Sequence, residues 1–375
     1  TFFMPTNSAL YIAFLLFGVG IYWVAPVRFR KSILLLLSVL FYAYYSVGNL
    51  VLLLLITAFT YAAAQLLLKL KRLRTLLFSV AVLVLGLCAF KYLSQIPLAS
   101  LRAFDLVMPL GMSYFTFEFI SLLTDIYRGS IKSCSFSNIC TYGLFFPARS
   151  AGPIKRFDHF VAQLSTPKME PKYLYYGLLF LLMGYAQKII IADPLVPFTN
   201  ALQDPANFTS AFDGLVHLYA YSIRIYADFA GLSNIAIGSA LLFGIVIPKN
   251  FEYPYLQANI AMFWRKWHMS LSDWARDYIY IPLGGNRASL MRSLFNLVAV
   301  MFIIGIWHGS TSNFAVWGLW HGAGLVVHRL WTLSGLRMNK LLGIFITFHF
   351  VTLGWAFFVT SSFATSIDIL RTLLL

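Results

Sequence analysis

The sequence predicts an all-α, polytopic membrane protein that forms one domain over residues 1–375. Two features of the composition lead to this prediction: 60% of the residues are hydrophobic and only 11% carry a charge. A soluble domain carries about 25% charged residues, so this chain lacks the polar surface that a water-soluble globule needs. The mean hydropathy of +0.77 and the aromatic share of 17% agree with extensive contact with lipid and headgroups.

The first part of the chain contains five apolar stretches that approach the length of a membrane-spanning helix, about 20 residues. They are residues 9–26, 33–46, 50–68, 76–90 and 109–127. The first stretch has no basic segment before it and no clear cleavage site after it, so it is predicted to be a spanning helix rather than a signal peptide. A polar segment near residues 94–105 separates the fourth stretch from the fifth.

The middle of the chain departs from this pattern between residues 145 and 171. This segment is too polar and too rich in proline for a simple span, so we predict re-entrant or interfacial backbone. Irregular backbone at membrane depth is tolerated only where protein or water covers it. Three further helices are predicted at residues 173–192, 215–232 and 235–246.

The region of residues 259–292 mixes tryptophan and tyrosine with arginine, a combination that favours the headgroup zone of a bilayer. It is predicted to lie in the interface or to dip partway into the membrane. Three spans follow at residues 294–306, 313–327 and 341–358, and residues 367–375 resemble a helix that is cut short. The whole chain is therefore predicted to have about eleven transmembrane helices, together with re-entrant or interfacial helices.

The formal net charge of +15 is explained by the tendency of basic residues to stay in cytoplasmic loops. If the basic loop at residues 28–31 is cytoplasmic, the next two helices bring the basic loop at residues 69–74 to the same side. Nucleic-acid binding is not predicted, because no basic run accompanies a soluble, groove-reading architecture. The three cysteines, Cys88, Cys134 and Cys140, do not form the pattern of a disulfide framework.

Polar side chains at membrane depth are candidates for function, because burying them in lipid is costly. His308 and His321 stand out, since each lies in a pentapeptide of the form Gly-x-Trp-His-Gly. Glycines beside a histidine let backbone or substrate approach closely, and an imidazole can act as a general base at neutral pH. The alternative for both residues is a core histidine that is bonded to a backbone carbonyl.

Two further polar residues are candidates. His268 lies in the run Phe-Trp-Arg-Lys-Trp-His of the interfacial region. It is either packed among tryptophans at the interface or a second polar group that faces the same cavity as His308. Asp228 lies in an apolar helix, where it either orients a histidine or pairs with Arg224, one turn earlier.

Other kinds of catalytic site lack their sequence patterns. Zinc needs three or four ligands, but the chain has no H-x-x-x-H or H-E-x-x-H pattern and no cysteine close to a histidine, so no metal site is predicted. The chain also lacks the G-x-S-x-G elbow, the Walker A pattern and the dinucleotide-binding glycine pattern. We therefore expect no bound cofactor.

Several longer motifs, taken in their order along the chain, make the sequence similar to one known family. They are Phe90-Lys91-Tyr92, the run from Pro109 to Glu118, the run from Asp125 to Gly129, Phe146-Pro147 running to Ala151-Gly152-Pro153, Tyr226-x-Asp228-Phe229, the run from Phe263 to His268, Arg276-Asp277-Tyr278, the run from Leu283 to Arg287 and Trp307-His308-Gly309. In this order they resemble the membrane-bound O-acyltransferases (MBOAT) over nearly the whole chain. The motif from Leu283 to Arg287 favours the bacterial exopolysaccharide O-acetylation group, typified by the alginate O-acetylation membrane protein, over the lipoteichoic acid D-alanylation group.

The resemblance implies a ring of helices around a central tunnel and acyl transfer from a thioester to a hydroxyl. It implies that His308 is the principal histidine, deep in the tunnel, and that His268 lies on the same path, on the cytoplasmic side. The chain departs from the family pattern of Gln, Ser and Asp at Arg224, Ala230 and Asn234, so no role is carried over to these three. Members of the exopolysaccharide group usually extend further at the C-terminus, which implies a final helix beyond residue 375.

We therefore predict an enzyme of the bacterial cytoplasmic (inner) membrane. It would transfer an acyl group, with acetyl-CoA as the donor substrate, to an extracytoplasmic polysaccharide, either directly or through a Ser of an acetyltransferase partner. His308 would act as the general base and His268 or a backbone N–H would stabilise the oxyanion, with His321 and Asp228 in accessory roles. The cations predicted to bind the phosphates of the donor are Arg265, Lys266, Arg276 and Arg287.

Two other functions fit the same residues. A transporter or channel for the acyl donor or the glycan would use the paired Gly-x-Trp-His-Gly motifs as a gate, without chemistry. An acyltransferase that acts on a lipid or a teichoic acid would share the chemistry and differ only in its acceptor.

Overall fold

The computed structural model describes residues 6–92, 109–149 and 151–373, and these residues form helices, turns and irregular backbone without strands. The all-α prediction is therefore confirmed for the described part of the chain. The polar segment predicted near residues 94–105 lies outside the described residues. The chain divides into two compact units, residues 1–185 with 231–248 and residues 186–230 with 249–375. The prediction of one domain over residues 1–375 stays a prediction.

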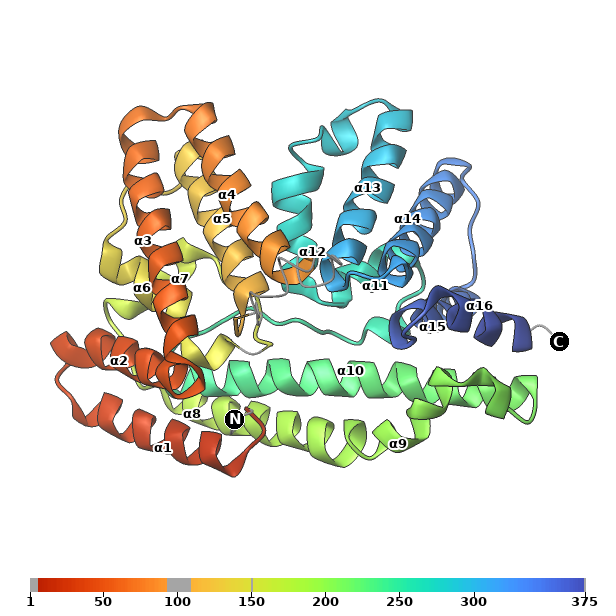
Figure 1. Cartoon of the computed structure of the whole chain (residues 1–375), viewed down its shortest axis with the longest axis horizontal. Coiled ribbons are helices and arrows are strands. Elements are labelled where there is room, and N and C mark those ends of the chain that lie inside the picture. The colour runs from red at the N-terminus through yellow and green to blue at the C-terminus, as the bar shows by residue number, and fades with distance from the viewer. Residues whose placement is uncertain (1–5, 93–108, 150, 374–375) are drawn as a thin grey trace, which may run out of the picture. The chain divides into compact units, whose positions relative to one another are not determined.

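The first unit contains eight α-helices and the end of a ninth. They are α1 (Ala9–Val24), α2 (Val27–Tyr45), α3 (Val47–Leu70), α4 (Leu73–Tyr92), α5 (Met112–Arg128), α6 (Phe136–Leu144), α7 (Phe157–Leu164), α8 (Pro171–Tyr185) and the C-terminal part of α10 (Ala211–Leu242). Figure 1 shows α3, α4 and α5 side by side. Serine side chains cap three of these helices, since Ser8 accepts a hydrogen bond from the backbone of Tyr11, Ser46 accepts one from Asn49 and Ser135 accepts one from Asn138.

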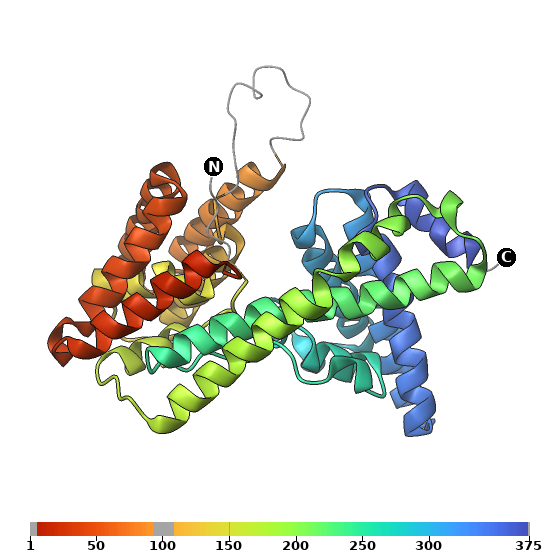
Figure 2. The ribbon, with the colours of Figure 1, turned by 90° about the horizontal axis from the view of Figure 1, so that it is seen from below.

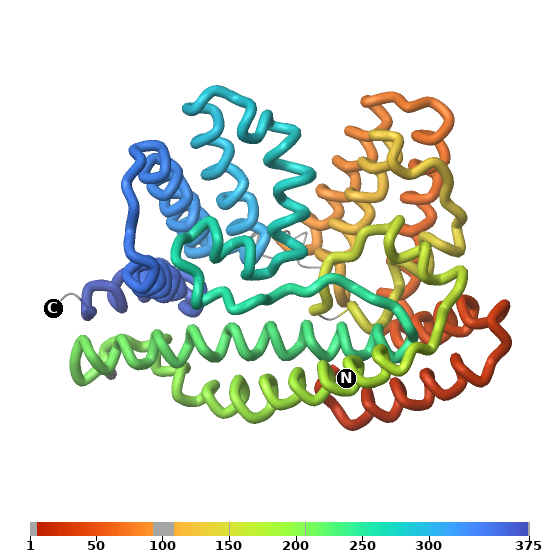
Figure 3. Tube along the Cα trace, turned by 180° about the vertical axis from the view of Figure 1, so that it is seen from behind, coloured from red at the N-terminus to blue at the C-terminus, as the bar shows by residue number. Residues whose placement is uncertain are grey.

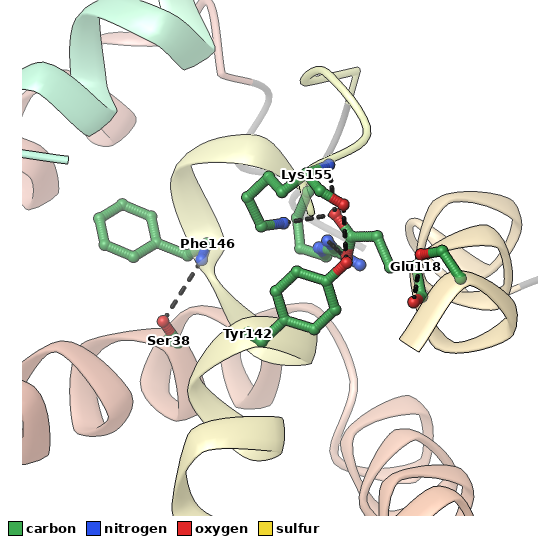
Figure 4. A network of polar contacts seen from close by, with 7 residues as sticks. Ser38, Glu118, Tyr142, Phe146 and Lys155 are labelled. Atoms are coloured by element: carbon green, nitrogen blue, oxygen red, sulfur yellow. Dashed lines mark hydrogen bonds and ion pairs between the residues drawn. The ribbon is translucent and has the colours of Figure 1, made fainter. Parts of the chain in front are cut away.

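The segment between α6 and α7 is irregular, as predicted, and protein covers it. It contains one short 3-10 helix, η2 (Phe146–Ala148), and the side chains of Phe146, Arg149 and Lys155 are buried. Polar groups from neighbouring helices hold its backbone: Ser38 accepts a hydrogen bond from the Phe146 N–H (3.3 Å), and Tyr142 donates one to the Lys155 carbonyl (2.7 Å) (Figure 4). The protein around the segment therefore supplies the partners that lipid cannot provide.

One helix replaces two that the sequence predicted. Residues 211–242 form a single 32-residue helix, α10, so the predicted break between residues 232 and 235 is wrong. Near this point α10 is approached closely by α8: a Cβ added at Gly184 of α8 would lie 2.7 Å from the Gly231 carbonyl oxygen. A second close approach joins Gly177 and Gly238. The glycines thus let α8 lie against the end of α10 without interrupting either helix (Figure 2).

The second unit begins with a π-helical continuation of α8 and ends with four longer helices. Its elements are η3 (Ala186–Ala192), α9 (Leu195–Thr199), η4 (Asn200–Gln203), η5 (Pro205–Asn207), the first part of α10, η6 (Pro254–Leu256), α11 (Ile260–Lys266), α12 (Met269–Ala275), η7 (Arg276–Tyr280), η8 (Gly285–Arg287), α13 (Leu290–His308), α14 (Ser312–Leu333), α15 (Lys340–Val359) and α16 (Phe363–Thr372). Figure 3 shows α13 and α14 as a hairpin with a short connection. The predicted interfacial region consists of the short helices α11, α12, η7 and η8, and its depth in a bilayer stays a prediction.

Six helices in the described part of the chain are long and apolar enough to cross a membrane. They are α3, α4, α8 with η3, α10, α13 and α15. The predicted number of about eleven is larger because two predicted helices merge in α10 and because α1, α2, α5 and α14 are not among these six; α1 and α5 are only 16 and 17 residues long. Exposed leucines on these helices, such as Leu55 and Leu182, provide the apolar surface that lipid requires, and the multi-pass prediction is confirmed.

Candidate functional site

His268 is held in an unusual backbone conformation at the start of α12. Its φ of 43° and ψ of 53° are left-handed, which costs a residue other than glycine about 1–2 kcal/mol. Asn250 supports this turn, because its carbonyl accepts a hydrogen bond from Met269 N (2.9 Å) and its Oδ1 accepts one from Ser270 Oγ (2.6 Å). Such strain persists only where the surroundings fix it, which is typical of functional positions.

The imidazole of His268 is buried. Only 1% of the residue is exposed, and neither ring nitrogen has a hydrogen-bond partner in the part of the chain that the structure describes. The ring packs edge-on against Phe229, with 4.6 Å between centroids, and lies 6.3 Å from the ring of Trp307. Burial lowers the pKa of His268 to about 3, so the imidazole is neutral at physiological pH. A neutral imidazole can donate one hydrogen bond and accept another.

His308 is the last residue of α13 and is more accessible than the other two candidate histidines, being only partly buried. Its ring meets Trp317 edge-on at 5.2 Å and Phe358 at 5.1 Å, and it lies 4.5 Å from the neighbouring ring of Trp307. The side chain therefore lies where a helix ends, in contact with aromatic rings from two other helices.

His321 lies inside α14 and is fully buried. Its ring contacts Trp317 at 4.8 Å and Trp264 at 5.2 Å, and Gly354 of α15 leaves room for it, since a Cβ there would lie 3.3 Å from Nε2. Among the described residues, neither ring nitrogen has a hydrogen-bond partner. His321 is therefore a core histidine, as the alternative expected, but the expected bond to a backbone carbonyl is not formed.

Two tryptophans join the three histidines into one cluster within the second unit. Trp307 lies between His268 and His308, and the two distances to it place these imidazoles no more than about 11 Å apart. Trp317 lies between His308 and His321, which are likewise no more than about 10 Å apart. The structure thus brings together the three histidines that the sequence singled out, and we call them the histidine cluster.

The glycines of the two Gly-x-Trp-His-Gly motifs bring α13 and α14 close together. A Cβ at Gly305 would lie 2.3 Å from the Phe314 carbonyl oxygen, and one at Gly318 would lie 2.5 Å from the Met301 carbonyl oxygen. Both positions therefore exclude any larger residue unless the backbone moves. The predicted close approach is confirmed, and the approaching group is the backbone of the partner helix.

Asp228 pairs with a lysine rather than with Arg224. Its Oδ1 lies 2.7 Å from Nζ of Lys188, which also contacts Asp193 at 2.6 Å. Arg224 instead donates a hydrogen bond to Oγ1 of Thr199 (2.6 Å). The carboxylate of Asp228 therefore joins α10 to the π-helical segment η3, and its predicted accessory role stays a prediction.

The four cations predicted to bind the donor differ in their surroundings. Lys266 is paired with Glu252, and Arg276 is paired with Asp273 (2.7 Å) and Asp277 (2.8 Å), so carboxylates already compensate both. Arg265 and Arg287 are exposed, and neither has an ion pair with any residue that the structure describes. Donor phosphates would therefore find uncompensated positive charge at Arg265 and Arg287.

Within the described residues, no three His, Cys, Asp or Glu side chains are grouped so that they could hold a metal ion.

Sequence reasoning missed two residues of this site. Asn250 supports the turn at His268 through Met269 and Ser270, but nothing in the sequence around it indicates a contact with residues 19 and 20 positions later. Trp317 could have been found, because it precedes His321 by four residues and positions four apart share one face of a helix.

These observations define a polytopic α-helical membrane protein whose interior holds three neighbouring imidazoles among tryptophans. The model of the "MBOAT, membrane-bound O-acyltransferase family" matches residues 34–361, a range that includes the whole histidine cluster. The chain belongs to this family and is an O-acyltransferase.

Curated relatives agree with this assignment. The chain is 33% identical over 378 residues to the "Probable alginate O-acetylase AlgI" of Azotobacter vinelandii, covering 94% of this chain and 74% of the relative. It is 32% identical over 391 residues to the "Peptidoglycan O-acetyltransferase" of Helicobacter pylori, covering 92% and 73%. It is 30% identical over 275 residues to the "Teichoic acid D-alanyltransferase" of Bacillus subtilis, covering 68% and 69%.

Proposed function

We propose that this O-acyltransferase moves an acetyl group from a cytoplasmic thioester, acetyl-CoA, to a hydroxyl for the O-acetylation of an extracytoplasmic polysaccharide. The observation that carries the proposal is the histidine cluster, in which a partly accessible imidazole lies within about 11 Å of one that is buried and neutral. Relatives described as alginate and peptidoglycan O-acetylating proteins support a glycan as the final acceptor. The protein would act in the bacterial inner membrane, where a cytoplasmic donor and an extracytoplasmic acceptor can both reach it.

In this proposal His308 is the general base. Its imidazole takes the proton of the acceptor hydroxyl as the oxygen attacks the thioester carbonyl and forms the new C–O bond. The C–S bond then breaks, and His308 returns the proton to the leaving thiolate, so the group is unchanged after each turnover. A base of this kind raises a rate by about 10²–10⁴. Its place at the end of α13 supports this role, since His268 and His321 are more deeply buried.

His268 is proposed to stabilise the negative charge that develops on the carbonyl oxygen. Because its imidazole is neutral and unpaired, one ring nitrogen can donate a hydrogen bond without first losing another partner. Such preorganised donors are worth about 2.7–4 kcal/mol of transition-state stabilisation. The left-handed backbone at residue 268 and the hydrogen bonds that Asn250 accepts from Met269 and Ser270 would keep that donor in place.

Arg265 and Arg287 are proposed to bind the phosphates of the donor, because they are exposed and have no carboxylate partner among the described residues. Guanidinium groups match phosphate in geometry and charge. The acceptor hydroxyl would belong to a Ser of an extracytoplasmic acetyltransferase partner or to the glycan itself.

The proposal is tested by supplying acetyl-CoA, labelled in the acetyl group, to the purified chain in vesicles with an added polysaccharide and the candidate partner. Acyl transfer predicts that label becomes covalently attached to the partner or the glycan and that free CoA accumulates in equal amount. A transporter would instead move intact labelled donor into the vesicle lumen and release no CoA, a result that contradicts the proposal. Label in extracted lipid or teichoic acid would keep the chemistry and change the acceptor.

A further inference from the structure

The segment of residues 283–287 is held between two neighbours in the second unit. The Tyr280 hydroxyl donates a hydrogen bond to Asn286 Oδ1 (3.0 Å) and lies 3.0 Å from Ser293 Oγ on α13. Asn296 of α13 donates another bond, from its Nδ2 to the carbonyl of the first residue in the segment (3.0 Å). Side chains therefore hold the segment near both of its ends, although all of its residues other than the two glycines are exposed.

Two consecutive glycines let this segment turn. Gly284 and Gly285 have φ angles of 108° and 52°, in the region that costs a residue other than glycine about 1–2 kcal/mol. A Cβ at Gly284 would also lie 3.1 Å from the Cβ of Ala288. The backbone from which the Arg287 side chain extends is thus fixed by the glycine turn and by the hydrogen bonds on either side of it.

The part of the chain that contains Arg287 has positive charge without negative charge. Residues 278–367 include no Asp or Glu, and the preceding carboxylate, Asp277, already pairs with Arg276 (2.8 Å). The basic residues of this stretch all lie at one end of the α13–α14 hairpin, and none has an ion pair with a residue that the structure describes: Arg287, Arg292, Arg329, Arg337 and Lys340. An anionic ligand would therefore meet no competing carboxylate from this stretch.

Arg329 of α14 lies level with Arg292 of α13. Gly322 faces Val298 across the hairpin, since a Cβ at the glycine would lie 3.0 Å from the Val298 Cα. Because the two helices are antiparallel (Figure 3), seven positions later on α14 corresponds to seven positions earlier on α13, at residue 291. Nε of Arg329 is buried and has no hydrogen-bond partner within the described residues. Two uncompensated guanidinium groups thus lie at the same level of the hairpin.

This end of the hairpin lies far from the proposed base. Arg292 and His308 are 16 residues apart on α13, which corresponds to about 24 Å along the helix axis. A ligand that binds the cations and also reaches His308 must therefore be elongated, with its anionic groups at one end. A thioester on a long arm that ends in phosphates, as in acetyl-CoA, has this form.

We propose that three arginines bind the phosphates of the donor: Arg287, Arg292 and Arg329. Tyr280 and Asn296 are positioning residues, because they hold the segment that carries Arg287. The inference rests on the proposed function, which assigns Arg287 to the donor, and it adds two binding residues and two positioning residues. Guanidinium groups match phosphate in geometry and charge. Since the segment is already held before the donor arrives, less conformational entropy is lost on binding.

Transfer kinetics with two donors test the proposal: acetyl-CoA and acetyl-pantetheine, which carries the same thioester without phosphates. The unmodified chain in vesicles, with polysaccharide and the candidate partner, should have a KM for acetyl-CoA at least about tenfold lower. Arg292→Gln and Arg329→Gln should each raise this KM about tenfold and leave the KM for acetyl-pantetheine unchanged. Equal KM values for the two donors in the unmodified chain would overturn the proposal.

Tyr280→Phe tests the positioning role, because it keeps the ring and removes only the hydroxyl. We expect the KM for acetyl-CoA to rise about threefold to tenfold at unchanged kcat, with no change for acetyl-pantetheine. Two controls should match the unmodified chain: Arg371→Gln, which removes an exposed arginine that already pairs with Asp368, and Tyr175→Phe, which changes an exposed tyrosine of α8. A purely structural role would impair transfer from both donors alike, and that result would contradict the positioning role.

Calorimetric titration of the purified chain with CoA separates this inference from the proposed function, because binding of CoA requires no acyl transfer. If the three substitutions weaken CoA binding but the unmodified chain transfers no acetyl group, the site stands and the proposed function is wrong. If the chain transfers acetyl groups and the substitutions leave both CoA binding and the KM for acetyl-CoA unchanged, the inference is wrong. Loss of phosphatidylglycerol binding alone in the variants would assign the cations to a lipid headgroup and would likewise overturn the proposal.

Discussion

The two buried polar regions of this protein are built in opposite ways. Around Glu118 the buried carboxylate accepts hydrogen bonds from two cations, and these bonds hold an irregular segment to α5. In the histidine cluster, by contrast, His268 and His321 are buried with both ring nitrogens unpaired. Charged groups need partners inside a protein, whereas a neutral imidazole tolerates burial at a lower cost. The ion pairs of the first region hold an irregular segment in place, whereas the unpaired imidazoles of the second have the hydrogen-bonding capacity that the proposed function requires.

The largest expected effect is on activity in the histidine cluster. His268→Asn should lower kcat by about 10²–10³, because it removes the donor that is proposed to stabilise the oxyanion. Asparagine adopts left-handed backbone more readily than most residues, so the turn before α12 should be kept. Acetyl transfer and thermal unfolding of the same preparation check both statements. If His268→Asn transfers acetyl groups at the unmodified rate, His268 does not stabilise the oxyanion, and the histidine cluster does not differ in function from the region around Glu118.

The next effect is on stability in the Glu118 region. Glu118→Ala should destabilise the first unit by about 3–5 kcal/mol, since it leaves Arg149 and Lys155 buried without a counter-charge. Denaturant unfolding measures this change. Asp158→Ala, which removes an exposed carboxylate on α7, is the matched control and should change stability by less than about 0.5 kcal/mol. Equal effects of the two substitutions would mean that the buried ion pairs do not support the fold.

A smaller effect is expected where α13 meets α14. Gly318→Ala should destabilise the protein by about 1–3 kcal/mol, because the new methyl group would lie 2.5 Å from the Met301 carbonyl oxygen. Gly86→Ala in α4 is the contrasting control, since nothing lies within 4 Å of its Cβ position. That substitution should stabilise the helix by about 0.5–1 kcal/mol. Thermal unfolding of the pair gives the sign of each change, and a stabilising Gly318→Ala would show that the helices can separate freely.

The last effect concerns pH and develops only as the solution becomes acidic. The folded chain holds His268 with a pKa of about 3, below the value of about 6.5 in the unfolded chain. Below pH 6.5 the unfolded state therefore binds a proton that the folded state does not bind. The contribution of His268 to the free energy of unfolding is fully present above pH 6.5 and is lost as the pH falls toward 3. The slope is at most about 1.4 kcal/mol per pH unit for one group. His268→Asn should remove this part of the acid sensitivity, and an identical pH dependence in both proteins would contradict the assignment.

Much of the fold could be predicted from the sequence, because long apolar stretches determine where helices form. The irregular segment after residue 144 and the short helices after residue 259 were also predictable from their polar and aromatic composition. The continuity of α10 was not, since the sequence predicted two helices, 215–232 and 235–246, where the structure has one. The close approach of Gly184 to the Gly231 carbonyl oxygen is a contact between distant residues, which the sequence alone does not reveal.

In the candidate site, too, local sequence patterns were predictable and contacts between distant residues were not. The repeated Gly-x-Trp-His-Gly pattern led directly to His308 and His321, because a repeated local motif is visible in one sequence. Ion pairs were less predictable. Arg224 lies one turn from Asp228 and was one expected partner of its carboxylate. The carboxylate instead pairs with Lys188, which lies 40 residues earlier. Lys266 is likewise compensated by Glu252, a carboxylate 14 positions before it. Long side chains reach partners that are distant in sequence, and spacing alone does not identify them.

The most direct test of the account is the rate of label transfer from acetyl-CoA by His308→Ala in vesicles, compared with the unmodified chain and with His349→Ala. His349 is already bonded to Tyr219 in α10, away from the proposed reaction, so its loss should leave transfer within a few-fold of normal. The account predicts that His308→Ala transfers acetyl groups about 10²–10⁴ times more slowly while its thermal unfolding is unchanged. Transfer by His308→Ala at the unmodified rate would contradict the central claim that this imidazole is the base.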